Sequence, residues 1–368
     1  MLKSLNVTGF RNLSSLSMEG LTRVNLLVGE NNAGKTSVLE AIEILLLART
    51  VPSALANGPM RRGENVPPRL DDEQSSGAEI DLEQLFHCRD ASPRSVIKLC
   101  GGTSEGALAL SCTVATTDSV NDTAALRTRM SLTELDASSS AYVVMTAEPG
   151  AHADRIPLVV SKSELVRRGR RSLSADARLE SPILHFVGTA APRTDALGSL
   201  WDGVVLTPEE NKVIEALQII QPDIERLAWL SHSRPGAGGM FVKLQGSDRR
   251  FPLGSMGEGI KRLLVLAMSL VKSAGGYLLV DEIDTGLHYS VMVKMWKLVV
   301  ETARRLDIQV FATSHSLDCI QALAGLYESE PDVRDDISLH RIEKGAEVSI
   351  RYSADEILSA ARRQVEVR

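Results

Sequence analysis

Aromatic residues and cysteines are scarce in this sequence. Phenylalanine, tryptophan and tyrosine make up 4% of its 368 residues, and there are only four cysteines. The cysteines form no C-x-x-C pair, and the seven histidines form no H-x-x-x-H or H-E-x-x-H set. A compact zinc site is therefore not expected, and the cysteines are interpreted as buried free thiols. They are Cys88, Cys100, Cys112 and Cys319.

Long apolar runs and an excess of positive charge are also absent. No window holds 18 or more apolar residues, and the N-terminal residues lack the apolar stretch and small-residue cleavage site of a signal peptide. We therefore expect a cytoplasmic protein without a membrane partner. The formal net charge of -6 argues against broad attraction to nucleic acid, although it is compatible with a local basic patch.

What is present is an ordinary globular composition on a chain longer than one typical domain. Hydrophobic residues make up 43% of the chain and charged residues 24%, and a typical domain has roughly 100 to 200 residues. Strand and helix patterns alternate in the last third of the chain, which is typical of a mostly parallel sheet covered by helices. We predict an α/β fold of this kind with an inserted antiparallel β lobe.

The inserted lobe is predicted to span residues 51–181. It begins with a Pro- and Gly-rich connection, and short segments rich in β-branched residues follow between 79 and 161. The flanking stretches 1–50 and 182–368 are predicted to form one head, with a helical segment at about 194–222. No sustained heptad pattern interrupts the head, so long coiled-coil arms are not expected.

A glycine-rich segment between a predicted strand and a predicted helix carries the first sign of chemistry. Residues 29–36, GENNAGKT, match G-x-x-x-x-G-K-[ST] in full. Its backbone N–H groups can turn toward phosphates, Lys35 can reach the β and γ phosphates, and the Thr36 hydroxyl can bind Mg²⁺. We therefore expect ATP and Mg²⁺ as ligands. The predicted nucleotide-binding residues are Gly29, Asn31, Asn32, Ala33, Gly34, Lys35, Thr36 and Ser37.

Two carboxylates follow a short apolar strand later in the chain. Asp281 and Glu282 come directly after the segment YLLV, at the carboxyl end of the strand, where ligands of open α/β sheets bind. We predict that Asp281 belongs to the Mg²⁺ shell. Glu282 is predicted to polarise the attacking water, because phosphoryl transfer depends on positioning and on neutralisation of charge. The alternative is an acidic turn that caps the next helix.

Together these features resemble the heads of ABC-type ATPases. The phosphate-binding segment, the segment GSMGEG (254–259) before a helix, the two carboxylates, and His315 after the strand QVFAT occur in the order found in such heads. The opening Gly9-Phe10-Arg11-Asn12 resembles the start of the RecF, SMC and OLD branch. The segment DEIDTGLHYS is similar to that of compact OLD-like AAA-family ATPases.

This resemblance implies a head-to-tail dimer. In such heads the signature segment of one subunit caps the γ-phosphate bound to the other, so Ser255 and Gly257 would act in trans while His315 senses the γ-phosphate in cis. Arg11 and Asn12 are implied to touch the nucleotide. The alternatives are a plain helix entry for GSMGEG, a packed histidine, and two surface polar residues after a strand. The implied catalytic residues are Glu282, His315 and Lys35.

Two departures from the family pattern affect the expected dimer contacts. The usual LSGGQ reads GSMGEG, and the aspartate of the SALD loop is replaced in TGLH by His288. The strand at 183–189 lies where a coupling glutamine would follow, yet no glutamine occurs there. The Q-loop residue is therefore not placed.

The densest positive run is a candidate for contact with DNA or with an acidic partner. Its arginines could meet phosphates, but aromatic residues that could stack on bases are missing around it. The alternative is an ordinary solvated loop. The arginines are Arg167, Arg168, Arg170 and Arg171.

The leading functional hypothesis is an ATPase that switches as a dimer with nucleotide. It would serve DNA maintenance such as repair, or a separately encoded effector such as a nuclease in phage defence. The segment after His315 contains no D-x-D pair, so a TOPRIM nuclease is expected to be a separate chain. The alternative is an ATP-bound scaffold or sensor that binds a partner protein without turnover. A transporter subunit is disfavoured because the LSGGQ and SALD forms are lacking.

Overall fold

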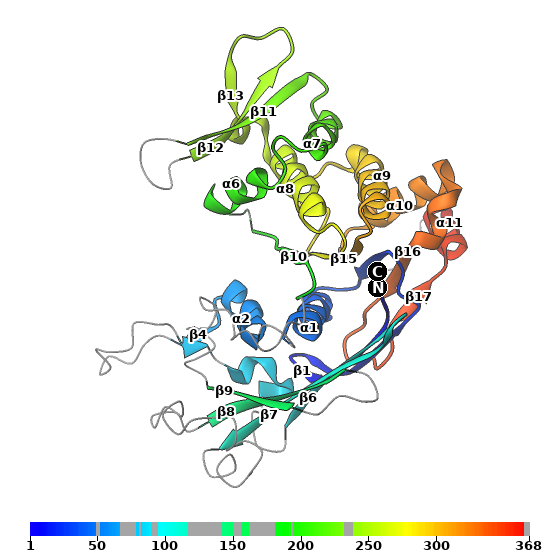
Figure 1. Cartoon of the computed structure of the whole chain (residues 1–368). Helices are drawn as coiled ribbons and strands as arrows, with labels where there is room; N and C mark the ends of the chain where they lie inside the picture. The colour runs from blue at the N-terminus through cyan, green and yellow to red at the C-terminus, as the bar shows by residue number, and fades with distance from the viewer. Residues whose placement is uncertain are drawn as a thin grey trace. The chain divides into compact units, whose positions relative to one another are not determined.

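The computed structural model consists of two compact units (Figure 1). The chain passes from the second unit to the first between Asn31 and Asn32, inside the predicted phosphate-binding segment. The first unit comprises residues 1–20, 32–182 and 342–349, and the second comprises residues 21–31, 183–341 and 350–368. The structure describes residues 1–48, 52–66, 79–80, 82–89, 95–116, 141–149, 156–161, 181–190, 192, 194–231 and 238–363.

The first unit is built on a six-stranded antiparallel sheet with the order β2-β1-β6-β7-β8-β9. Helix α1 packs closely against it. A side-chain carbon added at Gly101 of β6 would lie 2.6 Å from Leu2 Cδ2 and 2.9 Å from Leu45 Cδ2 of α1, so glycine permits the approach. The strands are β1 Leu2–Phe10, β2 Leu13–Glu19, β6 Val96–Thr103, β7 Gly106–Thr116, β8 Ala141–Pro149 and β9 Ile156–Ser161.

Buried carboxylates tie the segment after α1 to that helix. Glu40 and Glu43 of α1 are almost fully buried. Glu40 forms ion pairs with Arg11 (2.5 Å) and Arg62 (2.9 Å), and Glu43 pairs with Arg61. Pairing offsets the cost of burying these charges. The other elements of the unit are α1 Lys35–Leu47, η1 Pro52–Ala56, α2 Asn57–Arg62, β4 Asn65–Val66, β5 Glu79–Ile80, η2 Leu82–Leu85 and η3 His87–Arg89.

The second unit contains a six-stranded sheet with the order β10-β14-β15-β3-β16-β17, in which only β17 is antiparallel to its neighbour. Every residue of β3 and β15 is buried, as is typical of parallel strands in an α/β fold. The strands are β3 Val24–Val28, β10 Leu184–Val187, β14 Tyr277–Val280, β15 Gln309–Thr313, β16 Ile337–Arg341 and β17 Ile350–Tyr352.

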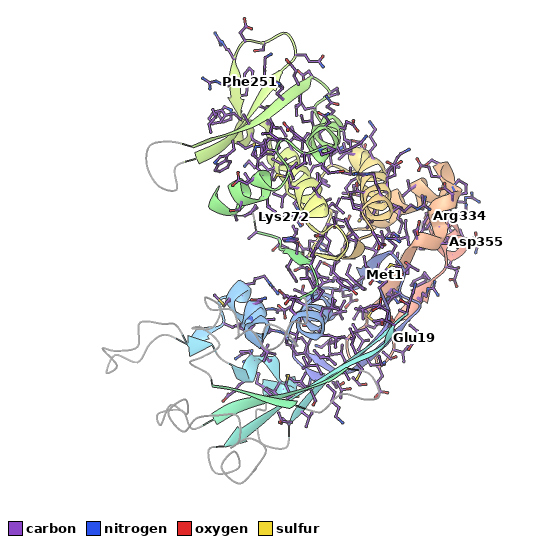
Figure 2. All side chains as sticks on the ribbon, viewed as in Figure 1. Met1, Glu19, Phe251, Lys272, Arg334 and Asp355 are labelled. Atoms are coloured by element: carbon purple, nitrogen blue, oxygen red, sulfur yellow. The ribbon has the colours of Figure 1, made fainter. Side chains whose placement is uncertain are left out.

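Helices and a small antiparallel sheet complete the second unit. In Figure 2, Lys272 lies at the end of α8, where its Nζ donates to the Ser199 carbonyl at 3.1 Å, and Phe251 lies on β13. The elements are α6 Thr194–Asp202, α7 Glu209–Gln218, β11 Ile224–Ser231, β12 Gly238–Leu244, β13 Arg250–Pro252, η4 Leu253–Met256, α8 Glu258–Lys272, α9 Tyr289–Arg305, α10 Leu317–Ser329, η5 Pro331–Asp336 and α11 Ala354–Arg363.

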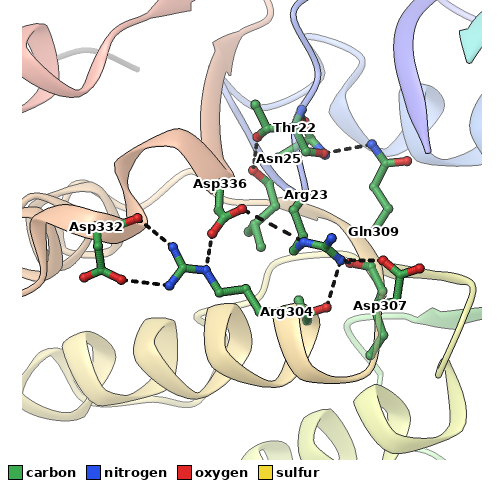
Figure 3. Close-up of polar contacts among 11 residues, drawn as sticks. Thr22, Arg23, Asn25, Arg304, Asp307, Gln309, Asp332 and Asp336 are labelled. Atoms are coloured by element: carbon green, nitrogen blue, oxygen red, sulfur yellow. Dashed lines mark hydrogen bonds and ion pairs between the residues drawn. The ribbon is translucent and has the colours of Figure 1, made fainter. Parts of the chain in front are cut away.

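A polar cluster fixes the amino ends of the central strands (Figure 3). The fully buried Asn25 accepts from the Thr22 N–H (2.8 Å) and from the Ser338 hydroxyl (2.8 Å), and donates to the Val310 carbonyl (3.1 Å). Because a buried amide is costly unless its hydrogen bonds are made, these contacts hold β3, β15 and β16 in one register. The register fixed at these amino ends also determines which residues lie side by side at the carboxyl ends of the strands.

The predicted α/β fold with a mostly parallel, helix-covered sheet is confirmed. Residues 51–181, predicted as an inserted lobe, lie within the first unit, which also includes β1, β2 and α1. All four cysteines are free, but only Cys112 and Cys319 are buried, whereas Cys88 and Cys100 are exposed. The prediction of buried thiols was thus wrong for two of them. Cys100 lies on β6 at a position that faces away from the buried side. The arginine run at 167–171 lies outside the described residues.

Candidate active site

The phosphate-binding segment follows β3, and its last two residues, Lys35 and Thr36, are the first two of α1. Gly29, Asn32 and Gly34 all have positive φ, of 144°, 62° and 113°. A side-chain carbon at Gly34 would lie 2.7 Å from Leu13 Cδ2, so both backbone conformation and space require glycine there. The Gly34 carbonyl accepts from the Val38 N–H at 2.9 Å. The sequence therefore folds into a turn that opens directly into a helix N-terminus, as an anion-binding loop requires.

Asn12 braces this loop from the hairpin between β1 and β2. Its Nδ2 donates to the Asn32 carbonyl at 3.1 Å, and its Oδ1 accepts from the Ser37 hydroxyl at 2.9 Å. One amide thus joins the loop backbone to the first turn of α1. Within the unit, the Asn12 side chain therefore contacts the loop and α1. Its contact with nucleotide stays a prediction.

Arg11 forms ion pairs with two carboxylates of its own unit. Its side chain is only 7% exposed and forms ion pairs with Glu40 and Glu64, the latter at 3.0 Å. The residue has φ of 52°, and its N–H donates to the Leu85 carbonyl at 2.8 Å. The structure therefore shows Arg11 joining the β1–β2 turn to α1 and to the segment after it, while a nucleotide contact stays a prediction.

The two predicted carboxylates lie at the carboxyl end of β14, beside Thr313 at the end of β15. The Thr313 hydroxyl donates to Asp281 Oδ1 at 2.6 Å and accepts from the Glu282 N–H at 2.8 Å. Thr313 was not predicted from the sequence. The available signal was a polar residue ending an apolar strand, since ends of neighbouring parallel strands meet at one edge.

Glu282 occupies a left-handed backbone conformation with φ of 48°, which costs on the order of 1–3 kcal/mol for a residue with a side chain. Its Oε2 accepts from the Thr285 hydroxyl at 3.1 Å, and its Oε1 lies 3.5 Å from His315 Nδ1. The side chains of Glu282 and His315 are 36% and 46% exposed. The pair is therefore open to solvent, and a carboxylate so placed can accept a proton from water.

The signature-like segment lies at the start of α8. Ser255 is exposed in η4, and its hydroxyl donates to the Pro252 carbonyl at 2.7 Å. Gly257 precedes the helix with φ of 98°, a conformation that a side chain would strain. The exposed helix entry presents N–H groups and the positive end of the helix dipole to solvent. His288 caps α9 instead, accepting from the Ser290 N–H at 3.4 Å.

The second unit brings part of the predicted site together at one sheet edge. Gly29 and Asn31 follow β3, the two carboxylates follow β14, and His315 follows β15, and these three strands are parallel. The remaining predicted residues are in the first unit or at the start of α8. Those in the first unit are Arg11, Asn12, Asn32, Ala33, Gly34, Lys35, Thr36 and Ser37.

Oxygen ligands at this edge fit magnesium better than a softer metal. Within the described part of the chain, no three His, Cys, Asp or Glu side chains gather into a metal site. Mg²⁺ is usually held by one or two carboxylates together with substrate phosphates and waters, and Asp281 at the end of β14 can supply such a carboxylate. Among the described residues, no helix combines the length and apolar character needed to cross a bilayer.

A phosphate-binding loop after one parallel strand, with paired carboxylates at the end of another, defines a P-loop nucleotide triphosphatase. Residues 118–318 match the family described as "AAA domain, putative AbiEii toxin, Type IV TA system", and residues 1–102 match the family described as "AAA ATPase domain". The chain belongs to the first of these families. It is a P-loop ATPase.

Several known proteins are similar to this chain over different lengths. An "ATP/GTP phosphatase" of Helicobacter pylori is 20% identical over 88% of this chain and 87% of its own. The "DNA replication and repair protein RecF" of Stutzerimonas stutzeri is 48% identical over 56 residues, or 15% of either chain. Among solved structures, the SMC head domain from Thermotoga maritima covers 96% of this chain and 98% of its own, with 13% identity and a TM-score of 0.45.

We predict that Thr313→Val slows hydrolysis without unfolding the protein. The change keeps the shape of the side chain but removes the hydrogen bonds to the Asp281 carboxylate and from the Glu282 N–H. The loss of about 1–3 kcal/mol corresponds to roughly 5- to 150-fold in kcat. Steady-state ATPase rates over a Mg²⁺ titration would test this, with Thr302→Val as the matched change at a buried threonine of α9. Equal kcat and equal Mg²⁺ dependence in wild type and Thr313→Val would contradict the prediction.

Proposed function

We propose that ATP closes two copies of this chain head to tail and that hydrolysis opens them. The exposed helix entry at Ser255 and Gly257 carries this proposal. Its N–H groups and dipole form an anion site that is open to a second molecule, as the signature segment of a dimeric head must be. Each of the two nucleotides would then touch both subunits.

Within one subunit, the proposed roles follow the chemistry of the side chains. Lys35 and the backbone from Gly29 to Ser37 bind the phosphates. Thr36 and Asp281 would hold Mg²⁺, which when bound neutralises charge on the β and γ phosphates. Glu282 takes the proton of the attacking water, and His315 contacts the γ-phosphate. The short distance between the Glu282 carboxylate and His315 supports this pairing, since a base and a γ-phosphate sensor must act on the same atoms.

A separately encoded protein is the partner that we favour. The family described for residues 118–318 names a toxin and a toxin–antitoxin system, that is, a system with a second component. An ATP-switched dimer could restrain or release such an effector. DNA maintenance is the second candidate, because the RecF match supports it, although that match covers 15% of the chain.

We expect Glu282→Gln to bind ATP and to accumulate as a dimer, because the general base is lost while the binding groups are kept. Hydrolysis should fall by about 100-fold or more. Size-exclusion chromatography with light scattering, with and without Mg-ATP, would measure the mass. Glu301→Gln, at an exposed position of α9, is the control. A Glu282→Gln protein that hydrolyses ATP at the wild-type rate would remove the assigned role. Full ATP binding with no hydrolysis in wild type would favour a scaffold.

A mixture of Ser255→Arg and Lys35→Ala proteins should recover activity that neither has alone. In a mixed dimer, one site combines the intact loop of the first subunit with the intact signature segment of the second. Since half of the dimers are mixed and each has one complete site, about a quarter of wild-type activity is expected. The mixture would be assayed after mass spectrometry has confirmed mixed dimers. No recovery in such a sample would refute action in trans.

The two partner classes can be separated by what changes the ATPase rate. Stimulation by duplex DNA or by DNA ends, with a steep dependence on salt, is expected for DNA maintenance. A copurifying chain, together with an ATPase rate indifferent to DNA, is expected for an effector system. Both measurements use wild-type protein from its native source, so that the partner is present.

A further inference from the structure

Arg262, near the start of α8, is a buried arginine that donates hydrogen bonds to the strand ends of the candidate active site. The residue is 8% exposed. Its Nη1 donates to the Gly188 carbonyl at 2.6 Å, and its Nη2 donates to the carbonyls of Asp281 at 2.7 Å and Glu282 at 2.9 Å. We propose that Arg262 is a positioning residue for hydrolysis, which sets the place of the Glu282 carboxylate by holding the backbone that carries it.

The three carbonyl groups that accept from Arg262 all belong to residues just after a strand, and this position explains why they need a donor. Gly188 follows β10 and Asp281 follows β14, and these neighbouring parallel strands end at the same edge. Carbonyl groups that emerge from a buried ladder have no strand partner and are costly if left unsatisfied. A planar guanidinium with five donors can serve several such groups at once in a fixed geometry, which a lysine ammonium on a flexible stem cannot do.

Arg262 also places a positive charge at this edge of the sheet. Burial lowers the pKa of Arg262, while nearby carboxylates, foremost Asp281 and then Asp284 and Glu282, oppose that change. The guanidinium stays protonated at neutral pH, because the ordinary arginine pKa is far above it. A positive charge is therefore held against the backbone that carries Asp281 and Glu282.

The backbone of Glu282 shows why such a clamp is needed. The residue has positive φ, so its conformation persists only if its surroundings fix it. Thr313 holds its N–H and Arg262 holds its carbonyl. With both peptide groups fixed, the side chain is directed to Thr285 and His315. Arg262 thus acts through Glu282, and the inference rests on the proposed role of that residue.

Arg262→Lys tests the inference in the full-length protein. The lysine keeps the charge but cannot serve the three carbonyls, so kcat should fall by about tenfold or more. Affinity for a fluorescent ATP analogue should change by less than about threefold, because Arg262 does not belong to the proposed phosphate-binding set. Arg304→Lys is the matched control, since Arg304 also serves several oxygens, on Asp332 and Asp336, but does so at an exposed place on α9.

A double-mutant cycle with Glu282→Gln separates positioning from a general structural role. If Arg262 acts through Glu282, adding Arg262→Lys to Glu282→Gln should lower the residual rate by less than about twofold. An equal loss in both backgrounds would overturn the inference, as would Arg262→Lys with wild-type kcat. If Arg262→Lys does not fold, Arg262→Gln retains one donor group for the same cycle. Unfolding of both variants would show a purely structural arginine and would also overturn the inference.

The same data distinguish failure of this inference from failure of the proposed function. If Glu282→Gln is inactive while Arg262→Lys is fully active, Glu282 keeps its role and Arg262 loses the one inferred here. If Glu282→Gln alone hydrolyses ATP at the wild-type rate, Glu282 is not the base, and both assignments fall together.

Discussion

The parallel register of the second-unit sheet is the constraint on which the candidate site depends. In register, Val280 lies beside Ala312, and Thr313 beside Leu27. The carboxyl ends of β14, β15 and β3 therefore lie at nearly the same height in the sheet. Because β3 and β15 are buried along their whole length, exposed polar groups can appear only beyond their ends. The register thus brings the start of the phosphate-binding loop, two carboxylates and a histidine to one edge.

Satisfaction of buried polar groups determines the finer geometry of that edge. Thr313 serves a carboxylate and an N–H, and Arg262 serves three carbonyls. Each contact is required because an unpaired polar group in a buried place is costly. The same contacts hold Glu282 in its left-handed conformation. Stability of the sheet edge and orientation of the reactive side chain therefore depend on the same hydrogen bonds.

In the first unit, ion pairs and hydrogen bonds likewise fix the segments around α1, the helix that follows the phosphate-binding loop. Glu40 and Glu43 on its buried side attract Arg11, Arg61 and Arg62. These pairs hold the segment after α1 against the helix, while Asn12, one residue after Arg11, holds the loop. A resemblance to a family assigned both residues to nucleotide. That assignment stays a prediction, and the contacts of both side chains within the unit are with the loop, with α1 and with the segment after it.

The sequence by itself determined the fold class, the phosphate-binding loop and the strand that ends in Asp281 and Glu282, because glycine spacing and apolar runs are local signals. It also suggested His315 and the segment at Ser255. It did not indicate Thr313, Arg262 or the sheet of β11, β12 and β13. Only the tertiary structure decided which distant oxygens these donors serve, since hydrogen-bond partners are fixed by strand order and register, and many residues separate Arg262 from Gly188 along the chain.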